Sequence, residues 1–213
     1  MRNLGLRDTE VLIGKWSYID EAACDGISVE QLLSGEGEGF FERRKMLFSA
    51  QASVKGAAYD AAVLLSLCGS ETALTACHYD AQPNLSAWCS LFDRYGNRQK
   101  PFYSFKAFGE LYRAKGAVLC ESVQQDGFAH TGIYAAAALS SSGEGYVMLA
   151  SFGGCGVVDL RLEGIPEDVY TADVYMLDGV KDMTLGDSVP VSGMKKRLLL
   201  NISEYGAALI KLY

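Results

Sequence analysis

The chain has 213 residues, of which 49% are apolar and 21% charged, with only four prolines. This composition excludes a disordered chain, and the length suits one large domain or two small ones. The chain has 26 acidic and 19 basic residues, a net charge of -7, and no basic cluster. We therefore expect no nucleic-acid partner and no binding to a membrane surface. Residues 1–6 lack the apolar core of a signal peptide, and the apolar run over 57–68 is too short to span a bilayer. We therefore expect a cytoplasmic protein.

The first half of the chain predicts two strand–helix units. The apolar run Val11-Leu12-Ile13 predicts a buried parallel strand, and the glycine-rich and acidic stretch 20–39 predicts a long mobile loop. Apolar residues at spacings of three and four over 41–67 predict helix, which Gly56 divides in two. Residues 72–79 predict a second strand, and 101–113 a further helix with proline in its first turn. The order strand, helix, strand, helix defines two βα units.

After Lys115 the pattern changes to short alternating strands. Alternating apolar side chains predict strands over 158–162, 174–176, 198–202 and 208–212. Turn signals at 142–145 (SGEG) and 178–179 (DG) separate strands of this kind. Short, regular strands are typical of an antiparallel β-sandwich. We place the boundary between the two parts near residues 113–117.

The cysteines and histidines predict no metal site and no cofactor. The six cysteines include no CxxC pair, and the only histidines are His78 and His130. We expect reduced thiols, with Cys68, Cys77 and Cys120 buried as small apolar side chains.

Several motifs occur in an order that resembles one family. Residues 77–83 (CHYDAQP), 87–93 (AWCSLFD) and 100–108 (KPFYSFKAF) resemble the end of the catalytic barrel in retaining glycoside hydrolases of the β-xylosidase (family 39-like) and arabinofuranosidase type. In that family a Tyr-Asp-(Ala)-(Arg or Gln)-Pro motif follows the eighth strand. A Trp-x-x-Leu-Phe-Asp loop and a Lys-Pro-Tyr-Tyr-x-Phe-Lys-x-Phe helix come next. Residues 55–62 are similar to the helix before that strand, and 206–212 (GAALIKL) to the last strand of the family's β-sandwich.

The resemblance implies a partial (β/α)8 barrel followed by an antiparallel β-sandwich. Residues 1–113 would hold the last two βα units of the barrel, and residues 114–213 the sandwich. A complete barrel needs roughly 250 residues. Retaining hydrolysis needs two carboxylates about 5 Å apart, and the family's acid/base glutamate follows the fourth strand, which has no counterpart here. The resemblance therefore implies a truncated glycoside-hydrolase-like protein whose ancestral activity is hydrolysis of xylosides or arabinosides.

The family's nucleophile position is occupied by a lysine. Lys15-Trp16-Ser17 stands where the family has a Glu-Trp-Asn type motif. An ammonium group has the wrong charge for a nucleophile or for stabilising an oxocarbenium-like transition state. We therefore assign no catalytic residue and expect the chain to be inactive alone, with Lys15 an ordinary solvated lysine. Asp20 and Glu21 are the carboxylates in the following loop that could reach the site.

The resemblance also implies a set of sugar-contacting residues. Aromatic faces suit the C–H surface of a sugar ring, and polar side chains bind its hydroxyls. Each also has a structural interpretation, such as loop packing for the aromatic residues, a core position for His78 and a capping role for Asp80. The substrate-binding candidates are Trp16, Tyr18, His78, Tyr79, Asp80, Gln82, Trp88 and Phe92.

Two alternatives to a truncated glycosidase stay open. The chain could be a carbohydrate-binding or assembly module, or a subunit of a split glycosidase. Two parallel strands do not make a stable sheet alone, and their edges pair readily with other strands. We therefore expect either self-association or a second chain that completes the barrel. The resemblance also implies carbohydrate as a ligand.

Overall fold

The computed structural model describes residues 10–20, 39–68, 73–83, 88–114, 117–119, 132–154, 156–163, 170–191 and 196–213. Over these residues the chain is a mixture of helices and sheets, with mostly antiparallel strands. The loop predicted over 20–39 falls almost wholly outside them, as do Cys120 and His130. Within the described part of the chain, no helix is long and apolar enough to cross a membrane.

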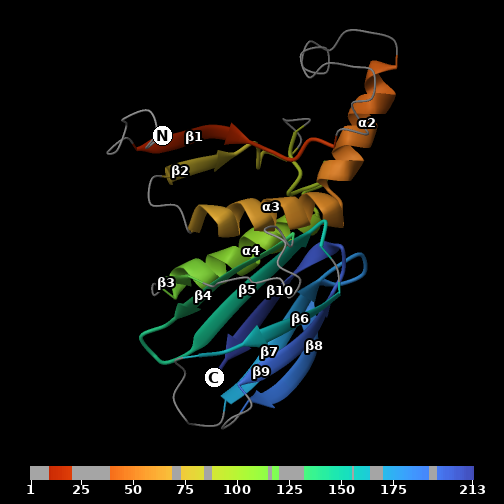
Figure 1. Cartoon of the computed structure of the whole chain (residues 1–213). Coiled ribbons are helices and arrows are strands. Elements are labelled where there is room, and N and C mark those ends of the chain that lie inside the picture. The colour runs from red at the N-terminus through yellow and green to blue at the C-terminus, as the bar shows by residue number, and fades with distance from the viewer. Residues whose placement is uncertain are drawn as a thin grey trace.

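The N-terminal half follows the predicted order of strands and helices. Strand β1 (Val11–Trp16) pairs in parallel with β2 (Ala73–His78), and helices α2 (Phe40–Gln51) and α3 (Val54–Cys68) lie between them in the chain. Helix α4 (Lys100–Arg113) follows β2. Among the described residues β1 and β2 form a sheet of two strands, which Figure 1 shows at the end of the molecule beyond α3 and α4.

The predicted division of the helical stretch is confirmed, but its position and its cause differ. The break falls at Ala52 and Ser53, and Gly56 lies inside α3. A Cβ atom on Gly56 would lie 2.1 Å from the Gln51 carbonyl oxygen. The glycine therefore does not end a helix. Its missing side chain leaves room for the first turn of α3 to pack against the last turn of α2.

The C-terminal half forms a six-stranded antiparallel sheet and a separate antiparallel pair. The large sheet has the order β3-β4-β5-β10-β7-β8, and β6 pairs with β9. The predicted turns at 142–145 and 178–179 join β4 to β5 and β7 to β8, which confirms them. The strands are β3 (Ala117–Leu119), β4 (Ile133–Leu139), β5 (Gly145–Phe152), β6 (Gly156–Arg161), β7 (Tyr170–Leu177), β8 (Asp182–Val191), β9 (Arg197–Ile202) and β10 (Tyr205–Leu212).

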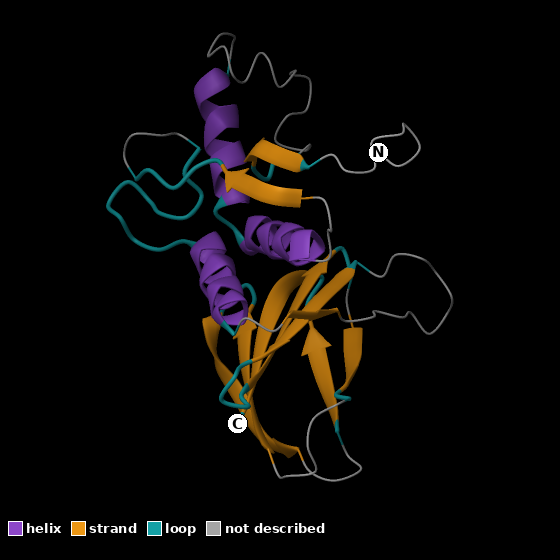
Figure 2. Cartoon of the chain, turned by 90° about the vertical axis from the view of Figure 1, so that its left-hand side faces the viewer, coloured by secondary structure: helices purple, strands orange, loops and turns teal. Residues whose placement is uncertain are grey.

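Both faces of the six-stranded sheet are covered. On one face, Ala57 and Ala61 of α3 and Leu111 of α4 share a buried cluster with Met148 and Leu209 of the sheet. On the other face, residues of β6 and β9 pack against β5, β7 and β10. Figure 2 shows the resulting layers, with α3 and α4 between the β1–β2 pair and the large sheet.

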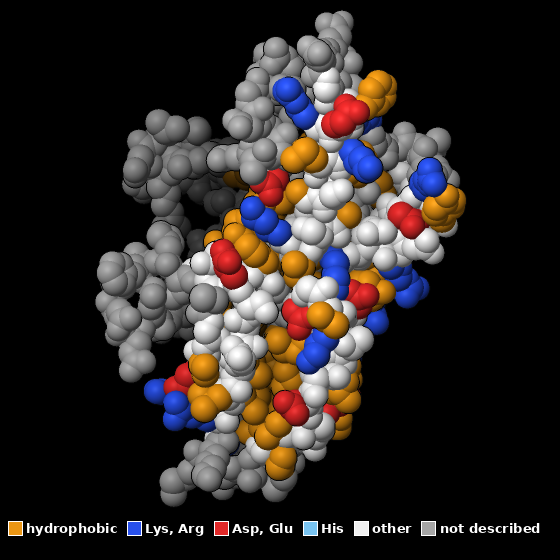
Figure 3. Space-filling view, turned by 90° about the vertical axis from the view of Figure 1, so that its right-hand side faces the viewer, with side chains coloured by type: hydrophobic (Ala, Val, Ile, Leu, Met, Phe, Trp, Pro, Cys, Tyr) orange, Lys and Arg blue, Asp and Glu red, His pale blue; other side chains and the backbone are white. Residues whose placement is uncertain are grey.

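Some apolar side chains stay on the surface. Val180, Leu185 and Val189 of the β7–β8 hairpin are exposed, and Figure 3 shows apolar side chains gathered on the part of the surface where the C-terminal strands lie. The prediction that Cys68 and Cys77 are buried was wrong, because both thiols are exposed. Cys68 ends α3, and Cys77 alternates with the helix-facing His78 along β2.

Candidate functional site

The carboxyl ends of β1 and β2 meet at one edge of their small sheet. Parallel strands end on the same side, and the register places Trp16 beside His78. Beyond the strands, the Tyr79 amide donates a hydrogen bond of 2.9 Å to the Trp16 carbonyl oxygen. Lys15, Trp16, His78 and Tyr79, which the sequence singled out on separate strands, are thereby brought together.

Lys15 and Tyr79 lie on the open face of the pair. The Lys15 ammonium lies 4.8 Å from the centroid of the Tyr79 ring, a cation–π contact worth about 0.5–1 kcal/mol at an exposed position. Lys15 is exposed. Tyr79 is 38% exposed, and Leu12 of β1 is 70% exposed. The accessible charge at the end of β1 is therefore positive, and its described neighbour is an aromatic ring.

Trp16 and His78 face the opposite way, into the layer of helices. Their rings lie edge to face with centroids 4.8 Å apart, and both contact Phe105 of α4, at 6.0 and 4.9 Å. The His78 Nε2 atom lies 3.5 Å from the Asp60 Oδ2 atom of α3. The structure thus places these two sugar-contact candidates in the packing between strands and helices.

Asp60 is a buried carboxylate that the sequence showed only as an interruption of an apolar run. It is 1% exposed. Burial raises its pKa, and the nearby His78 imidazole acts in the opposite direction. The 3.5 Å contact has the length of an ion pair, but neither imidazole nitrogen makes a hydrogen bond within the described structure. Asp60 Oδ1 and Trp16 Nε1 are likewise buried there without a hydrogen-bond partner.

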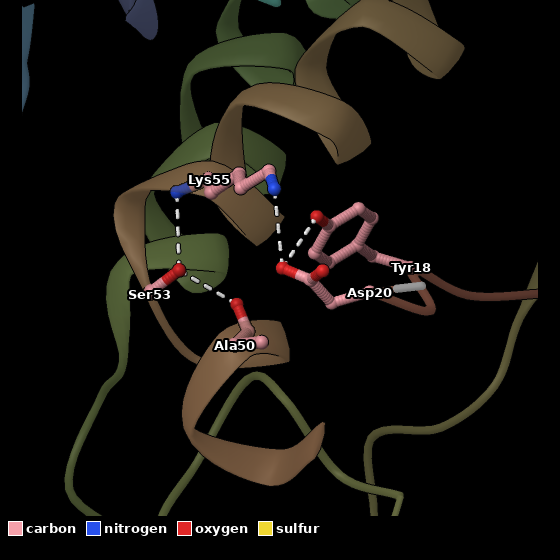
Figure 4. Close-up of polar contacts among 5 residues, drawn as sticks. All are labelled: Tyr18, Asp20, Ala50, Ser53 and Lys55. Carbon is pink, nitrogen blue, oxygen red and sulfur yellow. Dashed lines mark hydrogen bonds and ion pairs between the residues drawn. The ribbon is translucent and has the colours of Figure 1, made fainter. Parts of the chain in front are cut away.

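The segment after β1 is fixed by a polar cluster, which Figure 4 shows. The Tyr18 hydroxyl donates to Asp20 Oδ2 at 3.1 Å, and Lys55 Nζ of α3 lies 3.1 Å from the same oxygen. Burial raises the pKa of Tyr18, and hydrogen bonds to Tyr18 and Asp20 raise the pKa of Lys55. Asp20 is therefore held by Lys55, whereas Glu21 lies outside the described residues.

Tyr18 is the buried member of this cluster. Only 7% of its surface is exposed, and its ring contacts Tyr59 of α3 and Phe152 of β5, with centroid distances of 5.2 and 6.0 Å. The structure therefore places Tyr18 where the N-terminal elements meet the large sheet, away from Lys15 and Tyr79.

Gln51 is a positioning residue that sequence reasoning missed. It ends α2, is 1% exposed, and its Nε2 group donates to the Tyr18 carbonyl oxygen at 2.7 Å and to Ser17 Oγ at 3.1 Å. Since no motif marks a lone glutamine at a helix end, the sequence held no signal for this contact.

The remaining candidates lie in the loop after β2. The Asp80 amide donates to the Trp88 carbonyl oxygen at 3.4 Å, and Asp80 Oδ1 accepts the Gln82 amide at 3.2 Å. The Tyr79–Asp80 peptide bond is cis. Trp88 is half-buried, and the Phe92 ring packs 5.5 Å from Phe102 of α4. Asp80, Gln82 and Trp88 therefore stay near the strand ends, while Phe92 packs against α4.

Metal chemistry has no ligand set in this part of the chain. Over the described ranges, no group of three or more histidine, cysteine, aspartate or glutamate side chains is placed to hold a metal ion.

Comparison with known proteins identifies the fold as glycoside-hydrolase-like. No family model matches the sequence, and no curated protein matches it significantly. Among solved structures, the chain is similar to a family 30 subfamily 8 xylanase from Clostridium acetobutylicum, with a TM-score of 0.61, 10% identity and coverage of 99% of this chain and 43% of the xylanase. It is also similar to a glucosidase from Croceicoccus marinus, with a TM-score of 0.59, 13% identity and coverage of 99% and 47%.

A family 30 endoxylanase from Clostridium papyrosolvens gives a TM-score of 0.54 at 9% identity, with coverage of 87% of this chain and 46% of the endoxylanase. The chain thus spans less than half the length of these three structures. At such identities the likeness shows the fold alone, without singling out the β-xylosidase type that the motifs resemble.

Proposed function

We propose that this chain is part of a glycoside-hydrolase-like protein and does not hydrolyse glycosides by itself. In this proposal residues 1–113 correspond to the last two βα units of a (β/α)8 barrel, and residues 114–213 to its C-terminal β-sandwich. The order of β1, α3, β2 and α4 supports the first assignment, and the two packed antiparallel sheets support the second. The other barrel strands would come from a longer form of the polypeptide or from a second chain.

The observation that carries this proposal is the charge at the end of β1. The ammonium group of Lys15 rests on the Tyr79 ring, where a retaining glycosidase of the resembled type has its nucleophilic carboxylate. Retaining hydrolysis needs a nucleophile and an acid/base group. The Asp20 carboxylate, in the segment after β1, is held by Lys55 and Tyr18, which further supports a site without a free nucleophile.

Xylosides and arabinosides are the proposed ligand class. The motifs over 77–108 resemble enzymes of that class, and two of the similar solved structures are described as xylanases. Tyr79 is 38% exposed, and Asp80 and Gln82 follow it in the chain. These residues and Trp88 would form one wall of a sugar site.

A hydrolysis assay tests this proposal. The purified chain is incubated with aryl β-xylosides and aryl α-arabinofuranosides, and release of the phenol is compared with that from a Lys15→Ala variant and from buffer. We expect all three rates to be equal. Turnover by the purified chain that disappears in the Lys15→Ala variant would overturn the proposal.

A second candidate function is assembly with a chain that completes the barrel. Leu12 is 70% exposed on the open face of the β1–β2 pair, and Phe41 and Met46 of α2 are 79% and 57% exposed. Exposed apolar surface next to strand edges favours association. Sedimentation velocity tests this candidate: a dimer that a Leu12→Lys variant converts to monomer supports it, and a monomer at all concentrations argues against self-association.

A further inference from the structure

Lys100 is the first residue of α4, where its charge is unfavourable for the helix itself. A helix N-terminus carries a partial positive charge, and the first turn of α4 holds no acidic side chain that would offset the ammonium group. The lysine side chain is nevertheless only 19% exposed. A largely enclosed cation that weakens its own helix end needs partners on other elements.

The partners of Lys100 lie on the hairpin of β7 and β8. Its Nζ atom lies 2.7 Å from Asp182 Oδ1 and donates to the Lys181 carbonyl oxygen at 3.0 Å. The same carbonyl oxygen accepts the Asp178 amide at 3.1 Å. Asp178 Oδ1 in turn accepts the amides of Val180 and Lys181, each at 2.7 Å. The hairpin tip is therefore a closed turn that presents a carboxylate and a carbonyl oxygen to the start of α4.

Residues 91–99, directly before Lys100, form a closed loop. The Gln99 amide donates to the Leu91 carbonyl oxygen at 2.9 Å, which joins the two ends of the loop. The loop carries Phe92, one of the predicted sugar contacts. Because Gln99 both closes the loop and precedes Lys100, the contacts of Lys100 bear on the position of the whole loop.

We propose that Lys100 is a positioning residue through which the β7–β8 hairpin holds loop 91–99, so that the C-terminal sheet fixes a loop of the candidate site. The rest of α4 is held independently, because the Ser104 hydroxyl bonds Ala57 of α3 and Leu111 lies in the shared core. Loss of the Lys100 contacts should therefore loosen the loop and leave the helix in place. This tether can be measured without a ligand, and only its consequence for a bound sugar rests on the proposed function.

Amide exchange in the loop, followed by NMR, tests the tether. Lys100→Met keeps the length of the side chain and removes the ammonium group. We expect the amides of Asp93 and Gln99, which both donate to carbonyl oxygens of the same loop, to exchange about two- to fivefold faster. The effect is modest because the side chain of Asp182 is 46% exposed. Amides in the later turns of α4 should not exchange faster, since the variant removes an unfavourable charge from the helix start.

Variants on both elements make the test specific. Asp182→Asn removes the charged partner from β8 and should speed exchange of the same loop amides, while adding little to the effect of Lys100→Met when the two are combined. Lys100→Arg, which keeps the charge and the reach, should retain slow exchange. Lys106→Met on α4 and Asp187→Asn on β8 are matched controls, because both side chains are exposed, and neither should change the loop.

Two results would overturn the proposal. If the loop amides do not respond to Asp182→Asn, any effect of Lys100→Met is local to the start of α4 and the hairpin does not hold the loop. If the Lys106→Met and Asp187→Asn controls speed exchange in the loop as much as Lys100→Met does, the response is a general loss of charge and not the loss of a tether.

Discussion

At the scale of single residues, the structure rests on contacts that a sequence does not mark. The sequence predicted Gly56 as a helix breaker. In the structure its role is steric, because a Cβ atom there would lie 2.1 Å from the Gln51 carbonyl oxygen. Asp60 and Gln51 are buried polar residues whose partners lie on other elements. The sequence showed Lys15 as the departure from the family's nucleophile, but its place over Tyr79 depends on the strand register.

Gly56→Ala should destabilise the protein strongly. The new methyl group would clash with backbone atoms of Gln51 and Ala50, which cannot move aside as a flexible side chain can. We expect a loss of about 3 kcal/mol in the free energy of unfolding, measured by urea denaturation.

Gly109→Ala in α4 is the matched control for this substitution. Nothing lies within 4 Å of a Cβ atom there, so the variant should gain about 0.5–1 kcal/mol from helix propensity. Similar stability of the two variants would contradict the close approach of α2 and α3 at Gly56.

At the scale of elements, the strongly periodic segments were predictable and the irregular ones were not. The helix at 100–113 and strands β6, β7, β9 and β10 follow from alternation or helical spacing. Strand β4 is a run of alanines, β5 is apolar on both faces, and β8 is mostly exposed with two register shifts against β7. None of these three carries an alternating pattern, because burial on both faces or on neither removes it.

Ser104→Ala tests the packing of α4 on α3. The Ser104 hydroxyl is fully buried and donates to the Ala57 carbonyl oxygen at 2.7 Å. Removing it should cost about 1 kcal/mol of unfolding free energy. Ser66→Ala is the control, because Ser66 is exposed and its hydroxyl donates to the Ala62 carbonyl oxygen within α3 itself. Its loss should change stability by less than about 0.5 kcal/mol. Equal effects would show that the helix-to-helix bond contributes nothing.

At the scale of the whole molecule, helices α3 and α4 pack on the large sheet and share its buried core. Residues of α3 and α4 share one buried cluster with β4, β5, β7 and β10, and Lys211 of β10 pairs with Glu110 of α4. The buried core therefore crosses the predicted boundary near residues 113–117. Sequence patterns gave each half separately, because a shared core is a property of the packed chain.

Hydrogen exchange should reveal this unequal distribution of stability. We expect amides of α3, α4, β5 and β10 to exchange at similarly slow rates. Amides of β1 should exchange faster, because β2 is its one described strand partner and its side chain Leu12 is exposed. Exchange of β1 as slow as that of β10, in the same mass-spectrometric experiment, would contradict this view.

We propose above that the glycoside-hydrolase-like fold of this chain carries no working nucleophile. Retaining enzymes form a covalent glycosyl intermediate on a carboxylate, and an activated 2-deoxy-2-fluoro-xyloside traps that intermediate. The most direct measurement is the intact mass of the protein after incubation with this reagent. We expect an unchanged mass, and a stoichiometric adduct mapped to an Asp or Glu side chain would contradict the absence of a nucleophile.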